Sequence, residues 1–506
     1  MGTADSRLVA AALAAHRYGL GEPTLATLGS DPAAWLAAQI GPADAPRGEG
    51  LATLSDGIRA HAAFIQTQRR PARAEAARTA AAGAMADNTA PSMSAGAPMN
   101  MAGAAPMAGD TRSGEQQFGD HFRPIVQADV RSHLATAIVT QRPFAERLAW
   151  FWANHFTVSM AKASARALVG AFEREAIRPH IAGTFEHMLQ AAVRHGAMVR
   201  YLDNEQSAGP RSRVVAVLAR RAANNDRAAA RITGLNENLG REVLELHTLG
   251  AASKAYTQAD VTALAAVLTG WRIPARLAQQ ADIPDDDAVT RFDPAWHEPG
   301  AKVVLGKTYR EGAQALSEVL HDLALHPATA RHIALKLARH FVADEPPPAL
   351  VARLEEAFLR SGGDLPTVYR ALLSAPQAWE PQATKLKTPA EFIVSTWRLL
   401  GAGDAPLARN PDGGAGTLGQ RLQAAPSPAG WPDRAEDWLG PDAMWKRVEW
   451  ATRVAERFGR QRDARALARS AFGPLLSPAT AEQIDRAADG PQALALLLMS
   501  PEFQRR

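Results

Sequence analysis

The chain has 506 residues, with 56 Lys and Arg against 52 Asp and Glu, so it can bury a large core and its net charge of +4 gives no strong positive field. Its basic residues are scattered and no basic run alternates with aromatic residues, so we do not expect it to bind nucleic acid. It has no cysteine, which excludes disulfides, thiolate zinc sites and a cysteine nucleophile, and no apolar stretch reaches about 18 residues, so we expect no membrane span.

Residues 1–70 are predicted to form N-terminal helices that pack on the main domain. The apolar periodicity predicts helices over residues 7–18, 31–40 and 54–69. The apolar run that ends at His16 is short and no convincing basic segment precedes it, so it indicates a first helix rather than a signal peptide.

Residues 71–117 form a predicted disordered insert. They consist largely of Ala, Gly, Pro and Ser with five of the eleven methionines, and almost no aromatic or branched apolar residues. Such a segment cannot bury a core of its own. Methionine thioethers can bind copper(I), so metal binding is the alternative interpretation of this segment.

Residues 118–506 are predicted to form one main helical domain, so the fold class is mainly α with long functional loops and at most a small β-hairpin. The hairpin is expected at residues 303–305 and 308–309, and the long loops at 272–302 and 402–438. The periodicity predicts helices over residues 122–140, 142–154, 165–177, 185–194, 237–249, 257–269, 312–323, 327–341, 349–361, 365–374, 389–400 and 441–458, and near 461–470 and 478–499.

The first candidate for chemistry is the aromatic helix end that carries Asn154 and His155. Phe151 and His155 share one helical face, and Trp150 and Asn154 share another. A histidine in such a hydrophobic setting can have a perturbed pKa and transfer protons. The alternative is a core histidine that bonds the backbone.

The second candidate is the predicted helix over residues 237–249. Asn238, Glu242 and Glu245 form a stripe beside its leucines, and His247 lies on the far side of the leucine stripe. Carboxylates at a core edge need a cation, a metal or hydrogen-bond donors. The two glutamates therefore indicate an acid–base pair or a divalent metal site, and the alternative is ion pairing with Arg241 or Arg147.

Two further groups supply cationic side chains. His297 and Lys302 lie on the predicted loop before the hairpin and can cover a site, although ordinary loop polarity also explains them. His332, Lys336 and His340 recur every four residues on one helical face, which suits an anion better than a metal because the lysine repels cations. A solvated basic face is the alternative.

The last candidate is Gly430-Trp431-Pro432-Asp433, with Trp438 downstream. A tryptophan pair on a loop can stack on a sugar or an aromatic ligand. The alternative is an aromatic plug that docks the loop. We find no Walker loop, dinucleotide fingerprint, nucleophile elbow or His-Glu-x-x-His helix, which excludes several common enzyme classes.

Taken together, these motifs resemble the bacterial family known as domain of unknown function 1800, over residues 7–70 and 115–505. The insert is not part of the pattern. The segments that carry the resemblance are His16-Arg17-Tyr18-Gly19-Leu20-Gly21, 151–159, 236–250, Tyr256-Thr257-Gln258-Ala259-Asp260, Leu268-Thr269-Gly270-Trp271, His297 with Lys302, Leu305-Gly306, 326–341, Lys387-Thr388-Pro389 and Gly430-Trp431-Pro432.

The resemblance implies no settled reaction. It implies a partner, because such proteins are often encoded beside a family that resembles sulfatases and alkaline phosphatases and carries a twin-arginine export signal. Export together with that partner would give this chain a periplasmic location without a signal peptide of its own; otherwise a cytoplasmic location is expected.

Our leading hypothesis is an extracytoplasmic hydrolase that acts on a saccharide or another polar polymer. Its catalytic residues would be Glu242, Glu245, His155, His297 and Lys336. Its ligand-binding residues would be Asn154, Asn238, His247, Lys302 and Trp431. A divalent metal is the one cofactor that the carboxylates suggest. The alternatives are a non-catalytic partner or scaffold of the exported sulfatase-like protein, and a metal-binding protein.

Overall fold

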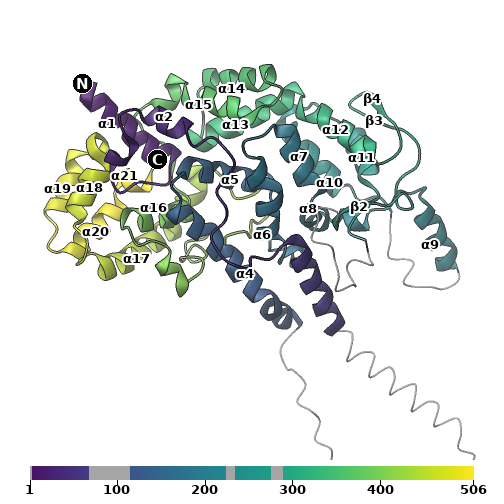
Figure 1. The fold of residues 1–506 in the computed structure, drawn as a ribbon, viewed down its shortest axis with the longest axis horizontal. Helices are drawn as coiled ribbons and strands as arrows, with labels where there is room; N and C mark the ends of the chain where they lie inside the picture. Colours follow the sequence, from purple (N-terminus) through teal and green to yellow (C-terminus); the bar gives the residue numbers. More distant parts are fainter. Residues whose placement is uncertain (1–2, 68–113, 224–233, 275–288) are drawn as a thin grey trace, which may run out of the picture.

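The computed structural model describes residues 3–67, 114–223, 234–274 and 289–506 (Figure 1). The predicted insert at 71–117 lies outside the described residues, apart from its last four, which begin helix α4. The predicted acidic part of the 272–302 loop also lies outside them.

The described residues are mainly α-helical, as predicted (Figure 1). The helices are α1 (Thr3–Leu13), α2 (Pro32–Ala37), one over residues 54–67, α4 (Gly114–Val139), α5 (Pro143–His155), α6 (Val169–Phe172), α7 (Phe185–Arg194), α8 (Gly196–Tyr201), α9 (Arg213–Ala223), α10 (Asn238–Glu242), α11 (Gln258–Leu268), α12 (Gln314–Ala324), α13 (Pro327–Phe341), α14 (Pro348–Arg360), α15 (Leu365–Leu373), α16 (Pro389–Leu399), α17 (Pro441–Phe458), α18 (Ala464–Phe472), α19 (Pro478–Asp485), α20 (Gly490–Met499) and α21 (Pro501–Gln504).

Local signals explain where these helices begin. Thr257 and Thr388 each form a capping box with the acidic residue three positions later, which satisfies backbone donors at the starts of α11 and α16. Pro327 occupies the first turn of α13, where its missing N–H has no cost. The α16 cap matters for the site, because its acidic member is the buried Glu391.

Three of the predicted helices end in π-helical turns in the described part of the chain. These turns are η1 (Ala14–Tyr18), η4 (Glu173–Ile177) and η8 (Val243–His247). A π turn takes one extra residue, so it rotates the following side chains away from the positions that a 3.6-residue repeat predicts, and such turns are frequent at functional sites. The predicted helix 237–249 is thus α10 followed by η8.

In the residues that the structure describes, the strands form two separate two-stranded antiparallel sheets. In one, β3 (Lys302–Val304) pairs with β4 (Lys307–Tyr309) around Gly306, as expected for the hairpin. In the other, β1 (Trp271–Arg272) pairs with β2 (Arg291–Phe292), which the sequence did not predict because each strand is only two residues long.

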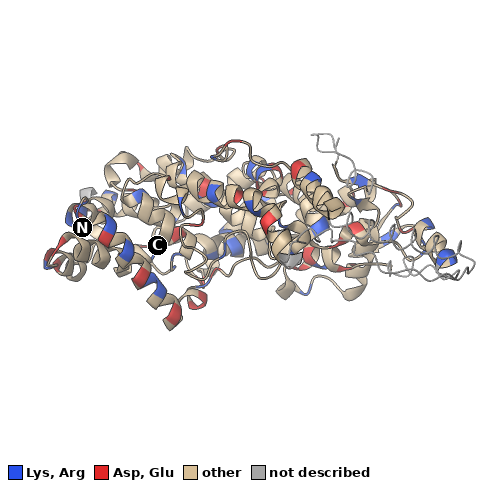
Figure 2. Cartoon of the chain, turned by 90° about the horizontal axis from the view of Figure 1, so that it is seen from below, with Lys and Arg blue, Asp and Glu red and all other residues tan. Residues whose placement is uncertain are grey.

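The two ends of the chain lie side by side. Figure 1 shows α1 against α18 and α21 at one end of the molecule, and His16 Nε2 lies 2.8 Å from the carbonyl oxygen of Ala471. Buried apolar residues from Ala11 to Phe503 form one contiguous cluster. Charged residues of both signs are spread along the chain (Figure 2), in keeping with the small net charge. No helix in the described segments has both the length and the apolar content needed to cross a bilayer.

Candidate functional site

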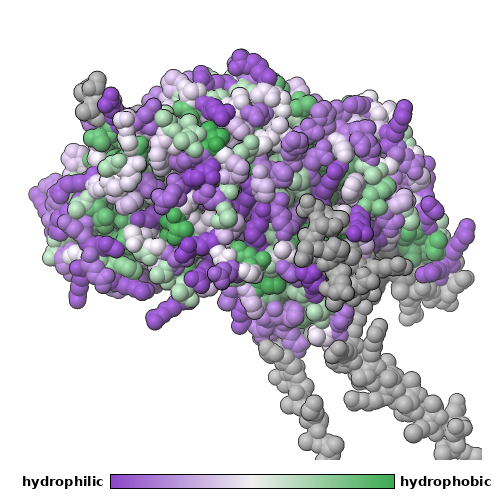
Figure 3. Space-filling view, viewed as in Figure 1, coloured by the Kyte–Doolittle hydropathy of each residue, from purple (hydrophilic) through white to green (hydrophobic). Residues whose placement is uncertain are grey.

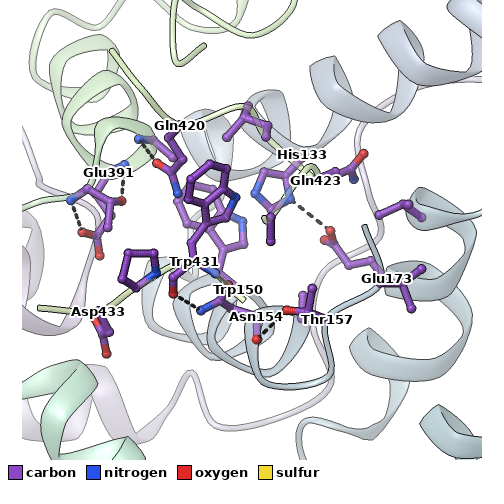
Figure 4. A pocket seen from close by; sticks show the side chains of 18 of the residues that line it. His133, Trp150, Asn154, Thr157, Glu173, Glu391, Gln420, Gln423, Trp431 and Asp433 are labelled. Atoms are coloured by element: carbon purple, nitrogen blue, oxygen red, sulfur yellow. Dashed lines mark hydrogen bonds and ion pairs between the residues drawn. The ribbon is translucent and has the colours of Figure 1, made fainter. Parts of the chain in front are cut away.

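Two neighbouring cavities lie between α4, α5, α13, α16 and the long loop before α17. The first, which we call the tryptophan chamber, has a volume of about 130 Å³ (Figure 4). Its polar and aromatic lining includes His133, Trp150, Asn154, Thr157, Glu173, His340, Thr388, Glu391, Gln420, Gln423, Trp431 and Asp433. The second, the lysine chamber, has a volume of about 220 Å³ and is lined by Phe151, Asn154, His155, Lys336, Arg339, His340, Ala429, Trp431, Pro432, Asp433, Arg434 and Asp437.

A histidine–glutamate pair lines the tryptophan chamber. His133 Nδ1 lies 3.0 Å from Glu173 Oε2, and the His133 ring stacks on Trp150 with 4.6 Å between the ring centroids (Figure 4). Burial alone would raise the pKa of Glu173, but His133 and Arg178 lower it to about 2. The ionised carboxylate therefore accepts a hydrogen bond from Nδ1–H of His133 and leaves Nε2 facing away from it.

The backbone around Glu173 explains how the pair forms. Glu173 is the first residue of η4, which continues directly from α6. A Cβ atom on Gly170 would lie 2.1 Å from the Asp129 carboxyl carbon, so only glycine lets α6 approach α4 this closely. That approach places the Glu173 carboxylate beside the imidazole of His133, one α4 turn from Asp129.

Several polar atoms at the tryptophan chamber lack partners. Trp150 Nε1, Trp431 Nε1 and Gln423 Oε1 are buried and make no hydrogen bond to any described residue. His133 Nε2 likewise has no hydrogen-bond partner among the described residues. Buried polar groups without partners cost about 1–3 kcal/mol each, so this lining is suited to a polar ligand that supplies the missing partners.

Asn154 joins the two chambers through the backbone of residue 431. Its Nδ2 donates to the Trp431 carbonyl oxygen at 2.9 Å, and its Oδ1 accepts from the Trp431 N–H at 2.7 Å. Gly430 has φ +87°, and a Cβ atom there would lie 2.5 Å from the Asn154 carbonyl oxygen. Glycine at 430 therefore lets the loop reach the end of α5, and both chambers share the wall that results.

Lys336 is the distinctive group of the lysine chamber. Burial lowers the pKa of Lys336 to about 8, with Asp433 opposing the shift and Arg339 adding to it. Its Nζ makes no hydrogen bond or ion pair with any described residue. The nearby Asp433 already has other partners: Lys385 Nζ at 3.4 Å, His340 Nδ1 at 3.3 Å and Arg506 Nη2 at 3.9 Å.

His155 lines the lysine chamber, and His247 lies behind it. His155 Nε2 lies 3.1 Å from the His247 carbonyl oxygen, and His332 Nε2 lies 3.1 Å from that of Leu246. The π turn η8 leaves these two carbonyl groups free to accept. Burial lowers the pKa of all three histidines, with Lys336 adding to the shift, so they are neutral at pH 7.

The structure brings together part of the predicted site. Asn154, His155, Lys336 and Trp431 line the chambers. His247 is fully buried behind them, and neither of its ring nitrogens has a partner among the described residues. Trp438, in contrast, is buried and donates to the Pro432 carbonyl oxygen at 3.2 Å, so it docks the loop.

The Asn238, Glu242 and Glu245 stripe lines neither chamber. Asn238 is exposed, and Arg241 Nη1 donates to Glu245 Oε1 at 3.3 Å on the same helix. Burial raises the pKa of Glu242, with Glu245 adding to the shift. Glu242 and Glu245 thus lie half-buried at the edge of the core, with an arginine as the partner of Glu245.

His297 and Lys302 form a separate polar cluster that also lines neither chamber. His297 Nδ1 lies 2.8 Å from the Thr269 carbonyl oxygen, and its Nε2 lies 2.9 Å from Lys302 Nζ. Lys302 also donates to the Glu298 carbonyl oxygen. These contacts tie the hairpin region to the end of α11.

Sequence reasoning missed His133, Glu173, Gln423 and Glu391. His133 and Glu173 are 40 residues apart on two predicted helices, and no local spacing marks them as a pair. Trp150 and Asp433 were inside quoted motifs, but only the fold gives them their neighbours. As for a metal, the described segments contain no group of three or more His, Asp or Glu side chains that could hold one.

Comparison with known proteins gives one match. The model of a family described as "Protein of unknown function (DUF1800)" matches residues 14–505, nearly the whole chain. No curated protein and no solved structure matches the chain.

Proposed function

Because the chain belongs to the DUF1800 family, which has no assigned function, we propose a function from its geometry: it hydrolyses an ester bond of a small polar ring compound of the saccharide class in the tryptophan chamber. The observation that carries this proposal is the pair of His133 and Glu173, at 3.0 Å, with Nε2 of His133 unpartnered within the described structure.

His133 is suited to act as a general base. Its Nε2 takes a proton from a water molecule as the water oxygen attacks the ester carbonyl carbon, and returns the proton to the leaving alcohol oxygen. Glu173 holds the ring orientation and stabilises the imidazolium that forms between the two steps. Glu173 itself stays ionised, because Arg178 Nη1 binds its other oxygen at 3.1 Å.

The chamber walls favour a polar ring as the substrate. Trp150 and Trp431 offer indole surface, and their N–H groups are free donors among the described residues. Gln423 Oε1 is a free acceptor for a hydroxyl group. A cavity of about 130 Å³ is close in size to one of about 150 Å³ that holds benzene, so it suits a single ring.

In this proposal, His133 and Glu173 take the catalytic roles that our leading sequence hypothesis gives to Glu242 and Glu245. A glycosidase needs two carboxyl groups on either side of the bond, one of them protonated. Glu391 and Asp433 line the chamber, but each forms an ion pair, with Arg147 and Lys385 respectively. Glu242 and Glu245 do not line the chamber. An ester needs only the base, so it fits the groups that are present.

The exported sulfatase-like partner and the periplasmic location stay predictions. On the face seen in Figure 3, hydrophobic residues lie in scattered spots between hydrophilic ones.

The test measures release of 4-nitrophenol from 4-nitrophenyl acetate and of acetate from O-acetylated monosaccharides. We expect His133→Ala to lower kcat/KM by about 100-fold or more. His195→Ala is the matched control, because His195 Nε2 lies 3.0 Å from Glu175 Oε2 but lines neither chamber. Full activity in a folded His133→Ala protein contradicts the proposal, and loss of activity in Glu242→Gln would restore the glutamate hypothesis.

A further inference from the structure

Three cationic side chains line the lysine chamber, and two of them have no carboxylate partner among the described residues. Lys336, Arg339 and Arg434 line it, together with Asp433 and Asp437. Arg434 pairs with Glu345 at 2.6 Å outside the chamber lining, and Arg339 Nε donates only to the Asp344 carbonyl oxygen. Lys336 and Arg339 therefore have no carboxylate partner in the described part of the chain, and Asp437, which is exposed, pairs with no described cation.

The neighbouring acid does not neutralise Lys336. Asp433 faces His340, Lys385 and Arg506, and both Lys385 and Arg506 are almost fully buried. Burial alone would raise the pKa of Asp433, but these three neighbours hold it below its usual range. The single charge of Asp433 is therefore shared among several cations, and Lys336 keeps a net attraction for an anion.

The histidines near Lys336 carry no charge that could balance its ammonium group. His155, His247 and His332 are neutral at pH 7. His155 and His332 each use one ring nitrogen in a hydrogen bond to a backbone carbonyl oxygen. A partly buried lysine without a carboxylate partner costs free energy in the folded chain. Such a group is retained most simply where a ligand supplies the missing negative charge.

The lysine chamber also adjoins the proposed site. Asn154, His340, Trp431, Pro432 and Asp433 line both chambers, so the two cavities lie on either side of the same side chains. We propose that Lys336 binds an oxyanion group, a carboxylate, sulfate or phosphate, in the lysine chamber. This inference does not depend on the proposed hydrolysis, and the anion site is testable alone.

The experiment is calorimetric titration of the full chain at pH 7 and constant ionic strength. The probes are glucuronate, glucose, sodium sulfate and sodium phosphate. We expect glucuronate or the inorganic anions to bind at least tenfold more tightly than glucose. Preference for sulfate or phosphate assigns the chamber to a tetrahedral oxyanion, and preference for glucuronate assigns it to a carboxylate; both outcomes support the proposal.

The variants separate this site from the hydrolytic one. Lys336→Met should lose the preference for anions by tenfold or more and remain folded, since it removes an unpaired, partly buried charge. Lys336→Arg should retain part of the preference, and Lys446→Met, at an exposed lysine paired with Asp442, should change nothing. His133→Ala should still bind the anion, so loss of hydrolysis alone leaves this inference standing.

Two results would contradict an anion site at Lys336. One is a wild-type chain that binds sulfate, phosphate and glucuronate no more tightly than glucose. The other is a folded Lys336→Met, or a folded Lys336→Gln as the second variant, whose anion binding equals that of the wild type.

Discussion

At the scale of single residues, two lysines near the site differ in burial and in their access to a ligand. Lys336 lines a chamber and is open to a ligand, whereas Lys387 is 1% exposed and lines neither chamber. Lys387 Nζ has no hydrogen-bond partner among the described residues and lies 4.2 Å from the ring centroid of Phe503. Burial lowers the pKa of Lys387 to about 7, with Glu391 opposing the shift and Arg147 adding to it.

This shift predicts how Lys387 affects stability as the pH changes. The folded pKa, about 7, lies below the unfolded value of 10.5, so between these values the unfolded chain holds the extra proton. Lys387 therefore costs the folded state most below pH 7, and the cost fades as the pH rises towards 10.5. We expect Lys387→Met to stabilise the protein by about 1 kcal/mol or more at pH 6 and by less at pH 9.5.

Urea unfolding of both proteins at the two pH values measures this difference. Lys446→Met is the control, because Lys446 is partly exposed and pairs with Asp442 one helical turn away. An equal effect of Lys387→Met at both pH values would show that Lys387 does not change its charge in this range.

At the scale of elements, the periodic helices could be predicted and the π turns could not. The helix 327–341 was predicted with its bounds, because an apolar stripe and Pro327 mark it. In residues 237–249, the prediction assumed one α-helix, but η8 rotates His247 relative to Glu242. Local sequence does not specify a π turn, since its advantage here comes from His155 and His332, which are far away in the chain and bond its carbonyl groups.

Tertiary contacts also decide which residues of the candidate site could be predicted from the sequence. Asn154, His155, Lys336 and Trp431 stood out because they lie in dense motifs. His133 lies in an ordinary amphipathic helix, and its function depends on a glutamate that a close helix contact brings to it. Such a contact is tertiary information that one sequence does not contain.

The end of η8 provides a test of this element. Gly250 has φ +85°, and a Cβ atom there would lie 2.8 Å from His332 Nδ1. We expect Gly250→Ala to destabilise the protein by about 2 kcal/mol or more, because it adds a clash to an unfavourable backbone conformation. Gly306→Ala is the matched control, since Gly306 has φ +77° but open space around it.

Urea unfolding of the two variants separates the cost of the clash with His332 from the cost of placing alanine at a positive φ. A larger loss for Gly250→Ala is the contribution of the His332 contact. Equal losses in both variants would mean that His332 moves away at no cost, and that η8 does not depend on this packing.

At the scale of the whole molecule, Glu391 connects segments from both ends of the chain. Its Oε1 lies 3.0 Å from Arg147 Nη2 and 3.0 Å from Arg506 Nε. Arg147 in turn donates to the carbonyl oxygens of Arg17 and Gly19. The first turns of the chain, the wall of the tryptophan chamber and the last residue thus depend on one buried carboxylate.

Removing that carboxylate should have a large effect. Burial alone would raise the pKa of Glu391, but Arg506 and Arg147 lower it to about 2, from 4.5. Its contribution is therefore complete above about pH 4.5 and is lost as the pH falls towards 2. We expect Glu391→Gln to cost about 3 kcal/mol or more at pH 7, because it leaves the buried Arg147 without a carboxylate partner.

Chemical unfolding at pH 7 and at pH 3 measures this contribution, and the gap between variant and wild type should narrow at the lower pH. Glu356→Gln is the control, since its pair with Arg360 is exposed and worth less than about 1 kcal/mol. A cost for Glu391→Gln no larger than the control's would show that the arginines find other partners.

The contact between Asn154 and residue 431 has a consequence for how this site can diversify. Asn154 bonds only main-chain atoms of Trp431, its N–H and its carbonyl oxygen. The loop is therefore anchored independently of which side chain residue 431 carries. The indole of Trp431 borders both chambers but takes no part in this anchor. Phe, Tyr or Leu at 431 can therefore change which ligand is accepted while the loop keeps its position.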